Sequence, residues 1–319
     1  MRIIFMGTPD FSVPALDALV EAGHEVMCVV AQPDKPKGRG KKLSSPPTII
    51  RARELGIPTK QPRAVRRGPF VEWMKNSGAD TAVVVAYGRI LIPDLLQAPR
   101  LGCINIHASL LPSYRGAAPI HWAIINGEQE TGVCTMQMDA GMDTGDVLLS
   151  RSASIGATES TEELWDRLAH LGAELIVETL ASLSSITPQP QQHEAATYAP
   201  LLTKQDGYID WNQPASAIHN RVRGVTSWPG AWTWWRESRL KLWFVRALNE
   251  PTTSPPGTVV RLRPRPVIAT AAGCVELIEV QQAGKKRTPA ESLVNGARLQ
   301  IGEQVGAPQS TTTQPNSEH

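Results

Sequence analysis

Residues 103–116 read CINIHASLLPSYRG, and this stretch decides the fold. Isoleucine alternates with other residue types over its first five positions, which predicts a buried strand. Period two places Cys103, Asn105 and His107 on one face of that strand. The loop that follows contains proline and glycine and leads into a helix expected over 117–126. An amide and an imidazole at the end of a buried strand are costly unless they find partners.

Outward from this stretch, buried strands alternate with amphipathic helices. The strands are expected at 2–6, 26–31, 80–87 and 102–107, and the helices at 12–22, 48–55, 117–126 and 161–183. Such alternation predicts an α/β fold with a doubly wound, mostly parallel sheet. Ligands of open α/β sheets bind at the carboxyl ends of the strands, where Asn105 and His107 lie.

The pattern changes near residue 184. A stretch rich in Ser, Thr, Pro and Gln predicts a linker, and the short strand-like runs after it predict a small β-barrel. These runs are 241–245, 257–262, 267–271 and 275–280. We therefore expect a catalytic domain at 1–188, a linker at 189–205, a C-terminal barrel at 206–306 and a disordered tail at 307–319.

The composition is that of a globular chain. It has 319 residues, 41% of them hydrophobic, and a net charge of +2, which excludes a strongly basic nucleic-acid packer. Four widely spaced cysteines argue against a disulfide scaffold or a structural zinc site and fit a reducing compartment. The N-terminus lacks a secretion signal, and no apolar run approaches the ~18 residues of a membrane span, so a cytoplasmic location is expected.

A second polar loop, residues 138–146, holds three carboxylates and two glycines and predicts a tight turn that presents an acid. The structural alternative is an Asx turn between strands. For Asn105 and His107 the alternative is a pair of hydrogen-bonded structural residues. The loop has too few oxygen ligands at alternate positions to form a calcium-binding loop.

These motifs resemble the active-site signature of the 10-formyltetrahydrofolate-dependent formyltransferases. The matching residues are Asn105-Ile106-His107, Ser109-Leu110-Leu111-Pro112 and Asp143-Thr144-Gly145. The segments 7–11, 32–36, 38–42, 85–88 and 283–286 further resemble the branch of that family that acts on initiator tRNA. The resemblance implies formyl transfer from 10-formyltetrahydrofolate, the co-substrate, to the α-amino group of methionine on initiator methionyl-tRNA.

The reaction implied by the resemblance suits these residue types. An amide N–H and an imidazole N–H can hold the oxyanion of a tetrahedral intermediate, so Asn105 and His107 are expected to polarise the formyl oxygen. A carboxylate stabilises a protonated imidazole, so Asp143 is expected to orient His107 and assist proton transfer. No metal and no covalent nucleophile is required.

Ligand-binding residues are expected on four loops and in the barrel. The resemblance places the folate at Ser109, Leu110, Leu111 and Pro112, with Tyr87, Gly88 and Asp139 as further candidates. Residues 35–42 hold five cations in eight positions, and the resemblance implies that this loop binds the tRNA acceptor stem. The tRNA candidates are Lys37, Arg39, Lys41, Lys42, Lys285 and Lys286. A solvated charge run is the alternative for the loop.

Several other functions remain open to the same sequence. A formyltransferase acting on an amino-sugar nucleotide shares the catalytic motifs, but the cationic loop speaks against it. A purine-pathway formyltransferase usually ends near the first domain. A nicotinamide-dependent oxidoreductase would need a GxGxxG fingerprint, which the turn after residue 6 lacks. A non-catalytic RNA-binding module would not need the buried Asn105 and His107. We expect a monomer.

Overall fold

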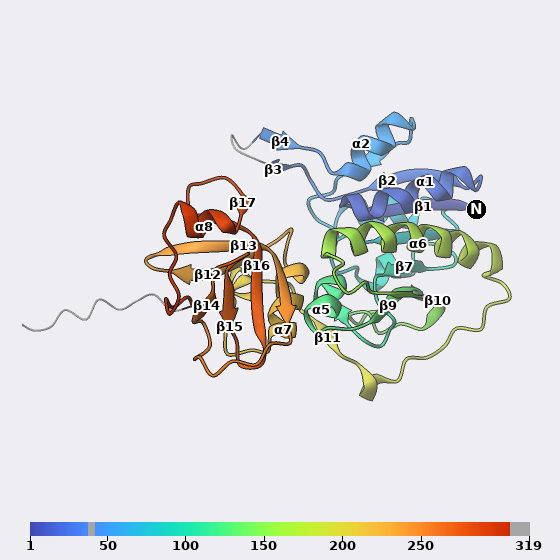
Figure 1. Cartoon of the computed structure of the whole chain (residues 1–319). Coiled ribbons are helices and arrows are strands. Elements are labelled where there is room, and N and C mark those ends of the chain that lie inside the picture. The colour runs from blue at the N-terminus through green and yellow to red at the C-terminus, as the bar shows by residue number, and fades with distance from the viewer. Residues whose placement is uncertain (38–41, 307–319) are drawn as a thin grey trace, which may run out of the picture. The chain divides into compact units, whose positions relative to one another are not determined.

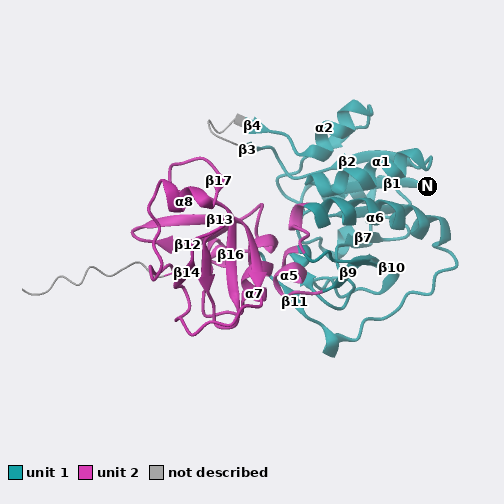
Figure 2. Ribbon diagram, in the orientation of Figure 1, with its two compact units in different colours: residues 1–120, 129–157, 163–201 teal, residues 121–128, 158–162, 202–319 magenta. Residues whose placement is uncertain are grey.

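The computed structural model describes residues 1–37 and 42–306, which divide into two compact units (Figures 1 and 2). Unit 1 holds residues 1–120, 129–157 and 163–201, and unit 2 holds 121–128, 158–162 and the chain from Leu202 onward. Unit 1 thus extends through Leu201, past the boundary expected at residue 188. The predicted tail, 307–319, lies outside the described residues.

Unit 1 is built on a sheet of strand order β10-β9-β7-β6-β1-β2-β5. The parallel strands are β1 (Arg2–Gly7), β2 (Glu25–Val30), β5 (Thr59–Lys60), β6 (Thr81–Val85) and β7 (Cys103–His107), and the antiparallel ones are β9 (Glu130–Gln137) and β10 (Val147–Ser154). The chain leaves β1 first toward β2 and β5, then returns to β6 and β7. This order confirms the doubly wound, mostly parallel sheet.

Helices pack on both faces of this sheet. They are α1 (Val13–Glu21), α2 (Pro47–Glu54), α3 (Pro69–Lys75), α4 (Pro93–Leu96) and α6 (Thr161–Ser182). A further helix, α5 (Pro119–Ile125), belongs mostly to unit 2. Apolar side chains of α3 and α4 share a core cluster with Cys103. The side chain of Ile106 lies on the opposite face of β7, where a Cβ placed on Gly172 of α6 would be 2.8 Å from it. Asn105 and His107, on the face of Cys103, therefore lie on the α3 and α4 side.

Unit 1 also contains two short strand pairs and two 3-10 turns, and a third 3-10 turn lies near the start of the long segment of unit 2. The first pair is an antiparallel hairpin of β3 (Lys35–Lys37) and β4 (Lys42–Ser44). The second pairs β8 (Arg115–Gly116) in parallel with β11 (Tyr198–Ala199). The turns are η1 (Asp10–Ser12), η2 (His193–Ala195) and η3 (Lys204–Gly207). The second pair ties part of the predicted linker to the loop after β7.

Unit 2 is an antiparallel sheet that closes on itself. Its strands are β12 (Ala231–Trp235), β13 (Ser238–Leu248), β14 (Val259–Arg261), β15 (Val267–Ala269), β16 (Cys274–Gln282) and β17 (Thr288–Pro289), in the order β12-β13-β16-β15-β14 with β17 on β16. Gln304 bridges to Thr258 at one edge and Val305 bridges to Trp235 at the other. The closure confirms a small β-barrel.

Two helices accompany this barrel, α7 (Ala215–Gly224) and α8 (Glu291–Asn295). The sequence pattern predicted only strands in this half, so neither α7 nor α8 was expected. Ala215, Ile218 and Val222 are buried at helical spacing, but cationic and polar residues between them dilute the apolar signal. No helix in the described part of the chain is long and apolar enough to cross a bilayer.

Candidate active site

Asn105 and His107 lie at the carboxyl end of β7, held by strands on both sides. Asn105 pairs with Val84 of β6 and Met136 of β9, and His107 pairs with Cys134. The residues are 8% and 6% exposed. The Asn105 side-chain amide has no hydrogen-bond partner within the described ranges, so it can still bond a ligand at this end of the strand.

His107 has its two ring nitrogens in different surroundings. Its Nε2 lies 3.0 Å from the carbonyl oxygen of Tyr114, which can only accept, so Nε2 carries a hydrogen. Its Nδ1 lies 3.8 Å from Oδ1 of Asp143. That separation exceeds a direct hydrogen bond and leaves Nδ1 free to exchange a proton with the carboxylate or with a reactant. The structure therefore brings together two residues that are 36 positions apart in the sequence.

Asp143 is fixed by its backbone as well as by its side chain. Its φ of 54° is left-handed, which costs about 1 kcal/mol or more for a residue other than glycine. Its Oδ2 accepts the backbone N–H of Gly116 at 2.8 Å. Its carbonyl oxygen accepts from Nε2 of Gln191 at 2.9 Å. Strained backbone of this kind gathers at functional sites, and Tyr114, with φ 60°, is a second case beside His107.

Arg115 and Gln191 are site residues that the sequence analysis missed. The Arg115 side chain, 2% exposed, donates from Nη2 and Nε to Oε1 of Gln191 at 2.7 and 3.1 Å. Its Nη2 also lies 3.1 Å from Nδ1 of His193. Arg115 sits in a loop without periodicity, and Gln191 sits in the stretch interpreted as a linker. No local pattern reveals that two such residues meet in the interior.

Tyr87 and Gly88 lie just after β6, beside β7. The Tyr87 hydroxyl is buried and has no hydrogen-bond partner in the described part of the chain. Burial raises the pKa of Tyr87 to about 12, so the phenol is neutral at physiological pH. Gln32 donates to the carbonyl oxygens of both residues at 3.0 and 3.1 Å, which fixes the turn that Gly88 makes at φ 76°.

The remaining folate candidates have other partners. Ser109 is 1% exposed and its Oγ donates to the carbonyl oxygen of Ser113 at 2.6 Å, so it shapes its own loop. Leu110 and Leu111 are half-buried, as is Pro112. Asp139 accepts from the N–H of Gly141 and from Oγ1 of Thr144, the Asx turn given as the structural alternative. Asp139 also lines a cavity of about 610 Å³ between residues 93–102 and 137–140.

The predicted tRNA contacts fall in two places. Arg39 and Lys41 lie outside the described residues, as do the side chains of Lys37 and Lys42. Lys285 and Lys286 are exposed in the turn between β16 and β17. Nearby on β12 and β13, Arg239 lies 4.0 Å from the ring centre of Trp232 and 5.5 Å from that of Trp234. Arginine stacked on half-buried tryptophan is a surface suited to bases and phosphates.

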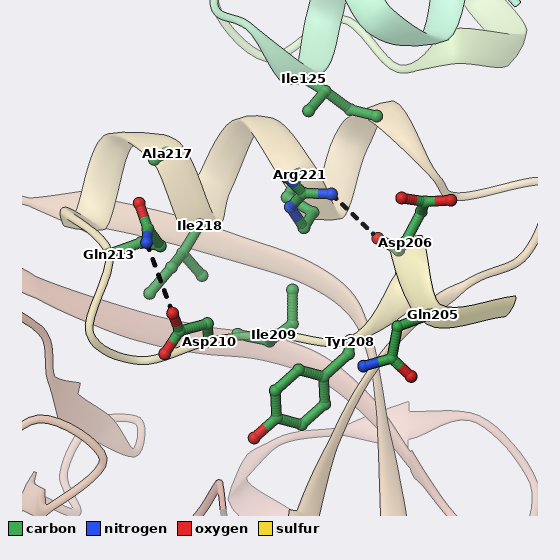
Figure 3. A pocket seen from close by; sticks show the side chains of 10 residues that line it. All are labelled: Ile125, Gln205, Asp206, Tyr208, Ile209, Asp210, Gln213, Ala217, Ile218 and Arg221. Atoms are coloured by element: carbon green, nitrogen blue, oxygen red, sulfur yellow. Dashed lines mark hydrogen bonds between the residues drawn. The ribbon is translucent and has the colours of Figure 1, made fainter. Parts of the chain in front are cut away.

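A cavity of about 320 Å³ lies within unit 2, beneath α7 (Figure 3). Arg221 donates to the backbone oxygen of Asp206, and Gln213 donates to the carboxylate of Asp210. Two of the polar residues drawn there are thus bonded to other residues of the unit, which leaves fewer groups to bind a ligand.

The described residues include no metal-binding cluster, and the two cysteines near the site are buried. Over residues 1–37 and 42–306, no group of three or more His, Cys, Asp or Glu side chains could hold a metal ion. Burial raises the pKa of Cys103 to about 12 and that of Cys134 to about 11, so both thiols stay protonated at neutral pH. The residues that meet at the site can supply hydrogen bonding by an amide and proton transfer by an imidazole and a carboxylate.

Comparison with known proteins identifies the family of the chain. A family model described as formyl transferase matches residues 1–180, and one described as formyl transferase, C-terminal domain, matches 201–298. The methionyl-tRNA formyltransferase of Solibacter usitatus is 50% identical over 308 residues, covering 96% of this chain and 99% of its own. That of Geobacter metallireducens is 49% identical over 309 residues, covering 96% and 99%.

Solved structures share the fold at lower identity. A sugar 3N-formyltransferase, WlaRD, is 17% identical with a TM-score of 0.66, covering 90% of this chain and 99% of its own. HypX from Aquifex aeolicus, in complex with tetrahydrofolic acid, is 18% identical with a TM-score of 0.62, covering 95% of this chain and 48% of its own. At such identities the likeness shows the architecture alone.

Proposed function

The chain belongs to the methionyl-tRNA formyltransferase family, and we propose that Asn105, His107 and Asp143 perform its reaction here. That reaction moves a formyl group from 10-formyltetrahydrofolate to the α-amino group of methionine on initiator tRNA. The observation that carries the proposal is the meeting, at one strand end, of an imidazole, a carboxylate and an amide that has no partner among the described residues. They do so in a chain whose relatives match it over nearly their full length.

Asn105 stabilises the charge that develops on the formyl oxygen. Attack by the methionine amine makes a new C–N bond and places a negative charge on that oxygen. The Asn105 amide is buried and unpaired within the described residues, so its N–H groups are available to this oxygen. Fixed donors of this type contribute ~10²–10³-fold in rate, because they need no reorganisation as charge appears.

His107 and Asp143 move the protons. Asp143 accepts the proton that the attacking amine must lose, and His107 delivers a proton from Nδ1 to the leaving nitrogen of the folate. The C–N bond to the folate then breaks, and its electron pair takes that proton. A proton crossing the 3.8 Å between Asp143 and His107 restores both groups. The Tyr114 carbonyl keeps Nε2 protonated throughout, so Nδ1 is the nitrogen that exchanges.

The folate is proposed to bind along the loops that follow β6, β7 and β9. The cavity lined by Asp139 is roomy enough for part of a flat bicyclic ring. The buried Tyr87 hydroxyl lacks a partner in the described residues and suits a polar atom of the ligand. Ser109 acts through the shape of its loop, since its hydroxyl is bonded to Ser113.

The tRNA is proposed to use the 35–42 segment, with Lys37, Arg39, Lys41 and Lys42, and the barrel turn that exposes Lys285 and Lys286. Two cationic segments match the phosphates of an acceptor stem. We propose a monomer, because all three catalytic side chains come from one chain. A cytoplasmic location fits a tRNA substrate and four free, buried cysteines.

Transfer of labelled formyl from 10-formyltetrahydrofolate tests the function. Charged initiator tRNA is the acceptor, with charged elongator tRNA and an amino-sugar nucleotide in parallel. Formylation of the initiator alone is expected. Formylation of the amino sugar instead would keep the catalytic residues and overturn the tRNA assignment.

Asp143→Asn tests the mechanism in the same assay. It removes the proton acceptor but keeps an oxygen for the Gly116 N–H. We expect kcat to fall ~10²-fold or more, with little change in folate affinity. Near-normal turnover of this variant would remove Asp143 from the mechanism.

A further inference from the structure

The segment after α6, residues 189–199, runs along the loops of the site, and we call it the strap. At its start, Gln189 pairs with Val147, next to the Asp143 loop. At its end, the carbonyl oxygen of Thr197 accepts the N–H of Arg115 at 2.9 Å. The strap therefore contacts both loops that supply His107 with partners. A composition typical of a linker hides this, because the pairing is long-range and mostly through the backbone.

Gln191 is the strap residue whose side chain points into this arrangement. It is 8% exposed, and its Nε2 donates to the carbonyl oxygens of Asp143 and Gly145 at 2.9 and 2.7 Å. Its Oε1 accepts both bonds from the buried Arg115. Both donors and the acceptor of the amide are in use, which fixes its orientation.

This amide joins the two loops around Asp143. On one side Gln191 holds the backbone of Asp143 and of Gly145. On the other it anchors Arg115, whose neighbour Gly116 binds the Asp143 carboxylate. The left-handed backbone of Asp143 is thus held at its carbonyl oxygen and at its side chain. Without the amide, a strained residue in a loop is free to relax and to carry its carboxylate away from His107.

We propose that Gln191, anchored by Arg115, is a positioning residue for formyl transfer. It touches no reacting atom and acts by fixing Asp143 at its 3.8 Å separation from His107. The inference rests on the role proposed for Asp143. Displacement of a catalytic group by about 1 Å can cost ~10²-fold in rate, which sets the size of the effect.

Gln191→Glu is the informative variant. A glutamate keeps the bonds from Arg115 and adds an ion pair, but it cannot donate to the two carbonyl oxygens and repels them. Gln192→Glu is the matched control, since it makes the same change one position along, at an exposed side chain. Each is assayed for kcat and for both KM values, alone and combined with Asp143→Asn.

We expect Gln191→Glu to lower kcat ~10- to 100-fold with KM values nearly unchanged, and Gln192→Glu to leave both within about 2-fold. When Asp143→Asn is already present, Gln191→Glu should lower kcat by less than about 2-fold, because the carboxylate that Gln191 positions has been removed. If Gln191 had only a structural role, Gln191→Glu would lower kcat by the same factor in the parent protein and in Asp143→Asn.

Three results separate the failures. Near-normal turnover of Asp143→Asn overturns the role proposed for Asp143 and this inference with it. If Asp143→Asn is slow, and Gln191→Glu lowers its kcat by the same factor as it lowers that of the parent protein, only the positioning role is overturned. Near-normal kcat of Gln191→Glu does the same. If thermal unfolding shows that Gln191→Glu does not fold, Gln191→Met, uncharged and of similar length, enters the same cycle with the same expectations.

Discussion

Strand β7 and the Asp143 loop supply the same site by opposite means. Asn105 and His107 inherit their positions from a sheet in which β6 and β9 fix the register on both sides. Asp143 sits in irregular backbone with φ 54°, and its place depends on bonds from Gly116 and Gln191, which come from two other segments. One half of the site is held by regular structure, and the other by a few specific hydrogen bonds.

This difference decides what substitutions do. A side chain on β7 can be replaced with little effect on its backbone, because ladder hydrogen bonds do not depend on it. Its loss therefore removes chemistry alone. In the loop, residues that never meet a substrate control the position of the carboxylate. Their loss should reduce the rate while leaving the strand half intact.

His107→Gln should have the largest effect. The variant keeps an amide that can donate to the Tyr114 carbonyl but loses the nitrogen that exchanges a proton beside Asp143. We expect kcat to fall ~10²–10⁴-fold, the usual share of a general acid–base group. Single-turnover formylation of charged initiator tRNA measures this. Circular dichroism and thermal unfolding should be close to those of the parent protein, and a variant retaining a tenth of the parent rate would contradict the role.

Gly145→Ala should come next, because it disturbs the loop without touching a reacting group. A Cβ at Gly145 would overlap the carbonyl oxygen of Gln137, which is backbone and cannot turn aside. The loop must shift, and with it Asp143. We expect kcat to fall ~10- to 100-fold together with a loss of ~1–3 kcal/mol in the free energy of unfolding, the range for overpacked sites.

Gly141→Ala is the matched control in the same loop. A Cβ there meets only the Thr144 side chain among its nearest neighbours, which can move at the expense of its hydrogen bond to Asp139, whereas no backbone atom need shift. It should leave the rate within a few-fold of the parent. Equal losses in the two variants would show that the loop does not depend on its contact with β9, and the contrast between strand and loop would fail.

The sequence could predict the strand half and only part of the loop half. Alternation in residues 103–107 indicates which side chains share a face, and this local information suffices to place Asn105 beside His107. Asp143 could be named from a motif, but its contact with His107 depends on a long-range crossing. Arg115 and Gln191 have no local signal, since a buried arginine and a buried glutamine are identified by a partner 76 positions away.

The same physics explains which fold elements were found. The long strands and α6 carry enough apolar positions for their periodicity to be read. The helix α7 was missed, because Arg221 and Arg223 interrupt its apolar face in the sequence while their side chains reach backbone oxygens in the structure. The strap was interpreted as a linker because its order comes from pairing with other loops.

Tyr87→Phe should have the smallest effect, and it tests a polar group at the same edge that has no partner in the described structure. Removing a buried, unpaired hydroxyl should raise the free energy of unfolding by about 1 kcal/mol. If the folate uses this hydroxyl, KM for the folate should rise several-fold while kcat holds. A destabilised variant would show that the hydroxyl has a partner in solution.

The pH dependence of unfolding gives an independent check on this tyrosine. Burial raises the pKa of Tyr87 to about 12, whereas an unfolded tyrosine titrates near 10. Between these values the unfolded chain loses a proton that the folded chain keeps, so stability falls as pH rises above 10. Tyr87→Phe removes this contribution, and its unfolding free energy should fall less steeply between pH 10 and 12, by up to about 1.4 kcal/mol per pH unit. If the unfolding free energies of the two proteins fell in parallel with pH, Tyr87 would be solvated. The loop after β6 would then open to solvent at this edge of the sheet, whereas β7 would stay closed.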